Sequence, residues 1–301
     1  MAVKEIILNC LPPKLREELK TISDEKFEKF TEIRIRVGRP IFVYSRDKEE
    51  IYMEKNPPLL EDLAHTLELM SNYSLYAMEE EIKQGYITIK GGHRVGIVGK
   101  VVLEGEKIRT IKNINAINIR ISHQVIGCSE SLYKTLFKED KLYHILIAAP
   151  PMCGKTTILR DFTRLLSDGG RKIALVDERS EIAGCFNGIP QNDVGMRTDI
   201  MDSCPKALGM MLMLRSMSPE IIVADEIGRK EDILAIEEVI NSGIKLICTV
   251  HAKDLEEIKN RPVLNELLNK NIFEKIVFLS RRNGIGTIEK IYDTRGEKNV
   301  I

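Results

Sequence analysis

Residues 149–156, with the sequence APPMCGKT, constrain the fold of this chain more than any other segment. They follow the apolar run 145–148 and precede apolar residues at helical spacing, namely Ile158, Leu159, Phe162, Leu165 and Leu166. A buried strand, a loop that ends in Gly-Lys-Thr and a helix form, in this order, the context of a phosphate-binding loop. The segment therefore predicts an α/β domain with a parallel sheet and a nucleotide site.

The predicted phosphate-binding set departs from the usual loop pattern at its first position, where Ala149 replaces glycine. We expect this to be tolerated, because the amides that contact phosphate come later, at the start of the helix. The predicted binding residues are Pro150, Pro151, Met152, Cys153, Gly154, Lys155, Thr156 and Thr157. Lys155 is expected to reach the β- and γ-phosphates, and the Thr156 hydroxyl to ligate Mg²⁺. The alternative is a lysine that caps an ordinary strand-to-helix turn.

A second motif lies about seventy residues later, where the apolar run 221–224 ends in two carboxylates. Asp225 is predicted to hold Mg²⁺ through a water, and Glu226 to orient or activate the attacking water. Alone, this pattern also fits two acidic residues at the start of a helix. Together with the phosphate loop, it favours a site for nucleotide hydrolysis.

Further polar residues follow two other predicted strands. Asp177, Glu178 and Glu181 come after the apolar run 173–176, and His251 comes after the run 246–250. The carboxyl ends of parallel strands lie at one edge of the sheet, where ligands bind. We therefore expect these side chains to converge on the site and predict catalytic roles for them, although a single histidine is usually structural.

The amino-terminal part has a different pattern. Short strands are predicted at 33–37, 41–44, 86–89, 92–98 and 117–121, with two helical segments between residues 59 and 83. After residue 140 the predicted elements follow one another in the order strand, loop, helix, strand. The predicted division is an α+β domain over 1–125 and a RecA-like or AAA-type ATPase domain with a parallel sheet over 126–301.

Composition bears on the class of partner. Acidic and basic residues balance at 45 each, and aromatic residues make up 5% with no tryptophan. Both features oppose a nucleic-acid motor. The six cysteines are far apart, which predicts free thiols. No stretch is apolar enough to span a membrane, so a cytoplasmic protein is expected.

The order of these motifs resembles the secretion ATPase family, which includes the motors of type II and type IV secretion and of pilus retraction. The pattern acid-acid-x-x-acid at 177–181 is similar to the acidic box of that family, and 249–251 is similar to its histidine box. The segments 31–40, 92–96 and 195–199 resemble, more narrowly, a sporulation branch of these ATPases.

The resemblance implies ATP as the nucleotide, although the sequence alone does not separate ATP from GTP. It implies a hexameric ring whose site is completed by arginines, for which Arg94 and Arg120 are the matched positions, with Arg197 and Arg215 as further candidates. It also implies membrane-protein partners in a sporulation channel between mother cell and forespore, which places the protein at the membrane periphery. Two alternatives stay open: a nucleotide-gated assembly factor with little force generation, and a RecA-like nucleic-acid motor.

Overall fold

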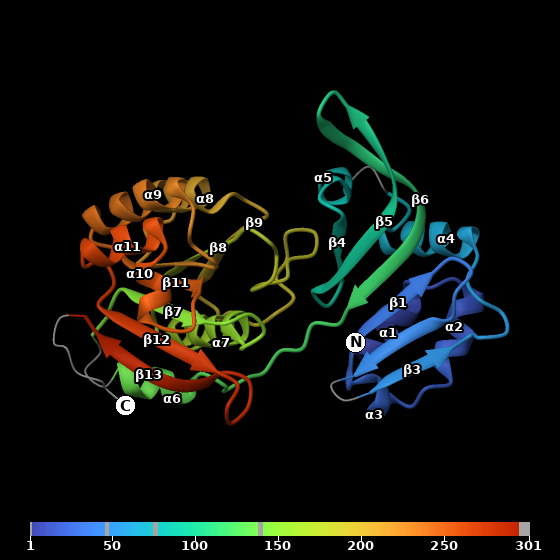
Figure 1. The fold of residues 1–301 in the computed structure, drawn as a ribbon, viewed down its shortest axis with the longest axis horizontal. Coiled ribbons are helices and arrows are strands. Elements are labelled where there is room, and N and C mark those ends of the chain that lie inside the picture. Colours follow the sequence, from blue (N-terminus) through green and yellow to red (C-terminus); the bar gives the residue numbers. More distant parts are fainter. Residues whose placement is uncertain (1, 46–47, 75–77, 138–140, 295–301) are drawn as a thin grey trace. The chain divides into compact units, whose positions relative to one another are not determined.

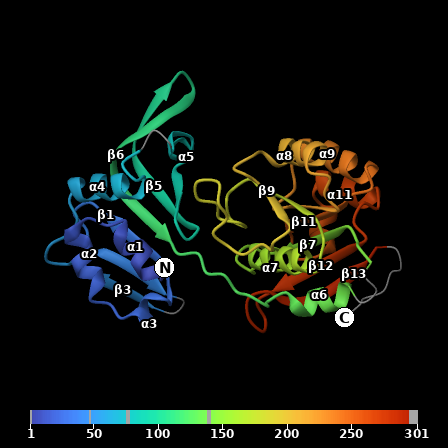
Figure 2. The ribbon, with the colours of Figure 1, turned by 180° about the vertical axis from the view of Figure 1, so that it is seen from behind.

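The computed structural model describes residues 2–45, 48–74, 78–137 and 141–294. Its internal contacts divide the chain into two units, Met1–His123 and Gln124–Ile301. Figure 1 and Figure 2 show the elements of each unit from opposite sides. The sequence-based boundary at residue 125 lies close to this division. Each unit has its own sheet and is described by itself.

Unit 1 contains a six-stranded antiparallel sheet in the order β3-β2-β1-β6-β5-β4. Its strands are β1 Phe30–Arg36, β2 Ile41–Ser45, β3 Glu49–Tyr52, β4 Tyr86–Ile89, β5 His93–Glu104 and β6 Lys107–Arg120. The predicted hairpin over 33–44 is formed by β1 and β2, and Gly38, with φ +68, provides the left-handed turn between them. β5 and β6 are longer than predicted. The prediction missed their outer halves because charged residues mix there with exposed valine and leucine and leave no alternating pattern.

Five helices accompany this sheet within the described residues: α1 Val3–Asn9, α2 Pro13–Lys20, α3 Asp24–Phe27, α4 Leu60–Met70 and α5 Glu79–Lys83. α4 and α5 are the two helical segments predicted between residues 59 and 83. Leu63 and Leu67 of α4 are buried at the expected spacing. α1, α2 and α3, which the sequence analysis did not predict, precede the sheet and contribute Ile7, Leu15 and Phe27 to the core.

Unit 2 contains a seven-stranded sheet in the order β13-β12-β7-β11-β10-β8-β9. Its strands are β7 Ile145–Ala149, β8 Ile173–Asp177, β9 Thr198–Asp202, β10 Ile221–Ala224, β11 Lys245–His251, β12 Lys275–Ser280 and β13 Thr287–Asp293. Every pair is parallel except β12 with β13, which form an antiparallel hairpin at the edge. The four apolar runs predicted as buried strands form β7, β8, β10 and β11, the centre of this sheet.

Helices cover both faces of the sheet of unit 2, as Figure 1 shows. They are α6 Glu130–Leu136, α7 Lys155–Asp168, α8 Lys206–Ser216, α9 Lys230–Asn241, α10 Leu255–Lys259 and α11 Pro262–Asn269. Alternate strand residues explain the two layers: Ile145 and Ile147 pack with α6 and α7, whereas Leu146 and Ala148 pack with α8, α9 and α11. The α/β fold predicted for this part of the chain is therefore confirmed.

Candidate functional site

Four central strands of unit 2 end at one edge of the sheet, and the site residues predicted at the ends of these strands lie there. Register fixes the arrangement, because β7 pairs in parallel with β11, β11 with β10, and β10 with β8. Lys155 follows β7, His251 ends β11, Glu226 follows β10, and Asp177 ends β8. The carboxyl edge of a parallel sheet is where such folds bind ligands.

The phosphate loop between β7 and α7 has two left-handed residues, Met152 with φ +60 and Gly154 with φ +85. Ala149 is the last residue of β7, is fully buried and pairs in register with His251. It is not among the residues with positive φ. Ala149 therefore needs no left-handed conformation, because the left-handed corner of this loop lies at Met152. α7 starts at Lys155, so the amides of its first turn have no intrahelical acceptor and can bind an anion.

A turn from the far end of the chain supports the outside of the phosphate loop. The amide of Gly286, between β12 and β13, donates to the carbonyl oxygen of Cys153 at 3.0 Å. A Cβ on Gly154 would lie 2.5 Å from Cγ2 of Ile285. In an anion-binding loop the amides face the ligand, so a carbonyl bonded elsewhere keeps the loop in that orientation. Ile285 and Gly286 thus limit how far the loop can move.

Lys155 is buried, with 6% of its surface exposed, and its ammonium donates to Nδ1 of His251 at 2.7 Å. Burial lowers the pKa of Lys155, while the carboxylates of Asp225 and Glu226 oppose this shift. A buried ammonium beside free helix amides creates a strong local attraction for a phosphate group. The position of Lys155 therefore fits the predicted contact with phosphate, which stays a prediction.

His251 lies between Lys155 and Glu226, and Glu226 in turn contacts Arg179. Nε2 of His251 lies 2.7 Å from Oε1 of Glu226, and Arg179 donates to Oε2 of Glu226 at 2.8 Å. A neutral imidazole with its proton on Nε2 satisfies both contacts of His251. Glu226 has φ +52, an unusual conformation for a residue with a side chain. Such strained residues cluster at functional sites.

Asp225 lies next to the start of α7. Its carboxylate accepts a hydrogen bond from the Thr156 hydroxyl at 3.2 Å and another from the Thr249 hydroxyl. The same Thr249 oxygen accepts the amide of Glu226 at 2.8 Å, so one buried threonine positions both acidic residues. Burial raises the pKa of Asp225, and the Thr249 bond opposes this shift.

The oxygen atoms of Thr156 and Asp225 are the hard ligands that Mg²⁺ prefers. Among the described residues, no three His, Cys, Asp or Glu side chains gather as a metal site. A nucleotide-bound Mg²⁺ does not require such a cluster, because phosphate oxygens and waters complete its coordination. The pair therefore fits the predicted metal position.

Asp177, predicted as a catalytic acid, has a carboxylate surrounded by backbone amides. It accepts the amides of Glu181, Ile182 and Ala183 at 2.9, 2.9 and 2.8 Å. Burial raises the pKa of Asp177 to about 6, and these three amides oppose the shift. This environment holds the turn after β8 in shape, and the catalytic role stays a prediction.

The other two acids of this turn differ from Asp177. Glu178 binds two cations, the buried ammonium of Lys206 and the guanidinium of Arg229 at 3.3 Å. Glu181 is half-buried at the start of the following loop, where its carbonyl accepts from Arg160 at 2.6 Å. A cavity of about 10 Å³ is lined by Asp177, Glu178, Arg179, Lys206, Asp225 and Glu226.

The four arginines that the family resemblance suggests make none of the contacts described above. Arg94 and Arg120 are opposite each other on β5 and β6 of unit 1, and Arg94 stacks on the Tyr86 ring at 3.6 Å. Arg197 donates to the Ser167 carbonyl at 3.3 Å, and Arg215 is exposed on α8. Their contribution to a nucleotide site stays a prediction.

Sequence reasoning missed Arg179 and the turn with Ile285 and Gly286 as parts of the site, and it gave Thr249 no role of its own although Thr249 lies in the segment similar to the histidine box. Thr249 had a signal, because it is a hydroxyl residue inside an apolar strand. The turn had none, since a Gly-Ile-Gly segment about 130 residues after the phosphate loop is brought there only by the pairing of β12 with β7.

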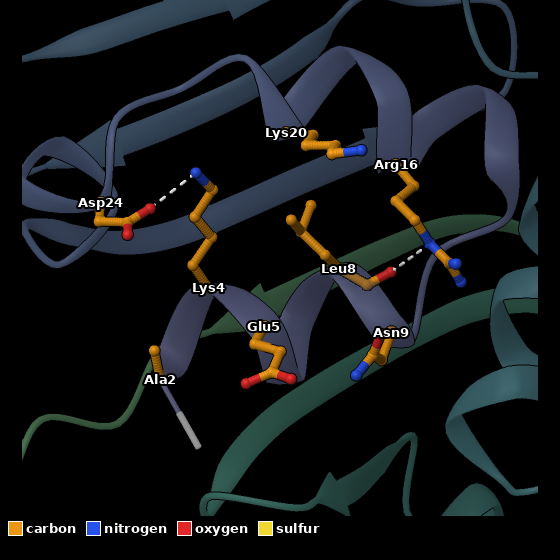
Figure 3. A pocket seen from close by; sticks show the side chains of 8 residues that line it. All are labelled: Ala2, Lys4, Glu5, Leu8, Asn9, Arg16, Lys20 and Asp24. Atoms are coloured by element: carbon orange, nitrogen blue, oxygen red, sulfur yellow. Dashed lines mark hydrogen bonds and ion pairs between the residues drawn. The ribbon is translucent and has the colours of Figure 1, made fainter.

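The pocket between α1 and α2 in unit 1, drawn in Figure 3, has a volume of about 400 Å³ and carries three cations. Two of them are held by the protein: Lys4 pairs with Asp24 at 2.7 Å, and Arg16 donates to the carbonyl of Leu8 at 2.9 Å. These contacts fix the helices to one another. The pocket is therefore a weaker candidate for phosphate than the strand edge of unit 2.

The profile of the family described as Sporulation stage III, protein AA matches residues 1–299. The chain belongs to this family. It is 42% identical over 295 residues to Stage III sporulation protein AA of Bacillus subtilis (strain 168), covering 96% of this chain and 95% of that protein. The sporulation resemblance seen in the sequence is thus confirmed. The chain is also 28% identical to the uncharacterized protein ycf45 of Porphyra purpurea, over 88% of its length and 43% of that protein.

Solved structures share the fold of this family member. The ATPase DotB of Yersinia pseudotuberculosis matches with a TM-score of 0.61 and 16% identity, over 94% of this chain and 80% of that one. The pilus retraction motor PilT with bound ADP matches with a TM-score of 0.59 and 14% identity, over 84% and 75%. The fold is that of the secretion ATPases, as the motif order predicts. Within the described part of the chain, no helix is long and apolar enough to cross a membrane.

Proposed function

We propose that the protein is a Mg²⁺-dependent ATP hydrolase that works in endospore formation. The observation that carries the proposal is the convergence of Lys155, Thr156, Asp225 and Glu226 at the carboxyl edge of one parallel sheet. The phosphate loop places Lys155 and Thr156, the end of β10 places Asp225 and Glu226, and together they supply the parts that phosphoryl transfer requires. The resemblance to secretion ATPases supports ATP as the nucleotide.

In this mechanism the amides at the start of α7 and the Lys155 ammonium bind and orient the phosphate chain. Mg²⁺, held by Thr156 and by Asp225 through a water, would neutralise charge on the phosphate oxygens. Glu226 accepts the proton of the attacking water, and Thr249 keeps the Glu226 backbone in place. His251 connects Lys155 to Glu226 and would respond to a phosphate group that draws Lys155 away.

The biological role we propose is to power or assemble a channel between mother cell and forespore, at the membrane periphery and with membrane-protein partners. Family membership supports the sporulation part, and the secretion-ATPase fold supports the channel and a hexameric ring. A nucleotide-gated assembly factor would use the same residues. Sporulation by cells carrying Glu226→Gln separates the two, because binding without hydrolysis suffices only for the assembly factor.

The test of the enzymatic proposal is ATP hydrolysis against protein concentration, with mass measured by light scattering in the same samples. Wild-type turnover should rise as the protein assembles, and Lys155→Ala should abolish it. Turnover that Lys155→Ala leaves intact would contradict the site. Turnover that stays constant in a monomer would contradict the ring. DNA-stimulated, salt-sensitive turnover would favour the nucleic-acid motor instead.

A further inference from the structure

Four side chains at the carboxyl edge of unit 2 form one row, in the order of the strands that carry them. Lys155 follows β7, His251 ends β11, Glu226 follows β10, and Arg179 follows β8. The contacts between neighbours are 2.7, 2.7 and 2.8 Å. The row has a cation at each end and the proposed catalytic carboxylate between them. The secretion-ATPase pattern explains Lys155 but leaves the position of Arg179 unspecified.

The turn that carries Arg179 is firmly held. The Asp177 carboxylate accepts three amides that follow the turn, and the Asp177 carbonyl accepts the amide of Ser203 at 2.9 Å. Ser180, directly after Arg179, has φ +51, and its hydroxyl bonds to Asp202. The backbone of Arg179 is therefore fixed beside β10, while its side chain remains 56% exposed and able to turn.

The contact between Arg179 and Glu226 contributes little to folding. An exposed ion pair stabilises a protein by at most about 1 kcal/mol. Glu226, however, is held in a strained conformation with only 24% of its side chain exposed. Both residues also line the 10 Å³ cavity, and about this volume is needed for one water. The arrangement is better suited to chemistry than to stability.

Charge favours a further cation beside Glu226, in addition to Lys155 and the proposed Mg²⁺. A terminal phosphate beside Lys155 brings negative charge close to the Glu226 carboxylate, and like charges at short range repel. Lys155 offsets this charge from one side only. A guanidinium on the opposite side can contact carboxylate and phosphate oxygens at the same time, because its donors form a planar fork.

We propose that Arg179 contacts the terminal phosphate group of a bound nucleoside triphosphate while it keeps Glu226 in place. The proposal rests on the proposed ATPase function and adds a residue that distinguishes triphosphate from diphosphate. In the hydrolysis step the water oxygen bonds to the terminal phosphorus as the bond to the bridging oxygen breaks. The leaving diphosphate takes that electron pair, the water proton passes to Glu226, and Arg179 stabilises the charge on the transferred group.

The experiment compares Mg²⁺-dependent binding of ADP and of a non-hydrolysable imido analogue of ATP to wild type, Arg179→Ala and Arg179→Lys. In Arg179→Ala, ADP affinity should stay within about twofold. Analogue affinity should fall about tenfold, the loss expected for one charge-assisted hydrogen bond. Turnover should fall about a hundredfold or more. Arg179→Lys should recover part of both losses, because it retains the charge without the fork.

Arg229→Ala is the matched control, because Arg229 is also exposed and pairs with Glu178 on the same turn. It should leave the ratio of analogue to ADP affinity unchanged. An unchanged ratio in Arg179→Ala, an equal loss in Arg229→Ala, or faster turnover in Arg179→Ala would overturn the proposal. If wild type binds neither ligand, or if Lys155→Ala binds both as tightly as wild type does, the nucleotide site itself is wrong. If wild type binds both and only the Arg179 prediction fails, the proposed function stands without Arg179.

Discussion

The carboxylate of Asp177 at the end of β8 and those of Asp225 and Glu226 after β10 lie in the same cluster, yet their partners differ. Asp177 after β8 is bonded to three backbone amides. Asp225 and Glu226 after β10 are bonded to side chains of Thr156, Thr249, His251 and Arg179. Backbone amides cannot leave without changing the fold, whereas side chains can move to a ligand. We therefore propose that Asp177 mainly stabilises the site, whereas Asp225 and Glu226 take part in the chemistry.

The largest effect should come from the β10 end. Glu226→Gln removes the proton acceptor but keeps the size of the side chain, so turnover should fall about a hundredfold to ten-thousandfold. ATP affinity and the unfolding temperature should stay close to those of wild type. Steady-state hydrolysis, equilibrium binding and thermal unfolding on the same preparation measure these three quantities. Unimpaired turnover would show that Glu226 takes no part in the chemistry, and it would contradict the role proposed for the residues after β10.

Lys155→Ala should have the next largest effect, on binding. Removing a buried ammonium that contacts phosphate costs about 1.5–3 kcal/mol, which lowers nucleotide affinity about ten- to a hundredfold. Titration calorimetry with ADP and ATP measures it. Lys253→Ala is a suitable control, because Lys253 is exposed and pairs only loosely with Asp254 at 3.9 Å within the described residues. Equal losses in the two variants would mean a general charge effect.

Asp177→Ala tests the structural half of the comparison. It leaves three amides without their acceptor, and we expect a loss of about 3 kcal/mol in the free energy of unfolding. Glu226→Gln should lose less than about 1 kcal/mol. Urea unfolding of both variants gives the difference. A stable Asp177→Ala protein without turnover would instead support the catalytic role predicted for Asp177 from the sequence.

The smallest effect is expected at the turn outside the phosphate loop. Ile285→Ala removes a half-exposed side chain, so stability should change by less than about 1 kcal/mol. Loss of its contact with Gly154 loosens the loop, and nucleotide affinity should fall about threefold, with Ile285→Val close to wild type. Leu234→Ala, an exposed residue of α9, is the control. Identical affinities in all four proteins would show that the turn does not position the loop.

Local patterns predicted the phosphate loop and the β10 carboxylates, because each motif lies within about ten residues and its strand is a continuous apolar run. Arg179 escaped prediction, since an exposed arginine in a turn resembles any solvated charge until β8 is placed beside β10. Ile285 and Gly286 required the long-range pairing of β12 with β7. The outer half of the β5–β6 hairpin was missed because its exposed Val101, Leu103 and Ile108 follow no buried face.

The measurement that tests the central claim most directly is ATP hydrolysis by the wild-type protein, with Mg²⁺ and after its removal by a chelator. Phosphate release should require Mg²⁺, stop on chelation and return when Mg²⁺ is restored. Thr156 and Asp225 supply only part of the metal coordination and the nucleotide supplies the rest, so the metal can be removed and replaced. Absence of hydrolysis over the full range of protein concentration, or hydrolysis that continues without the metal, would contradict the account.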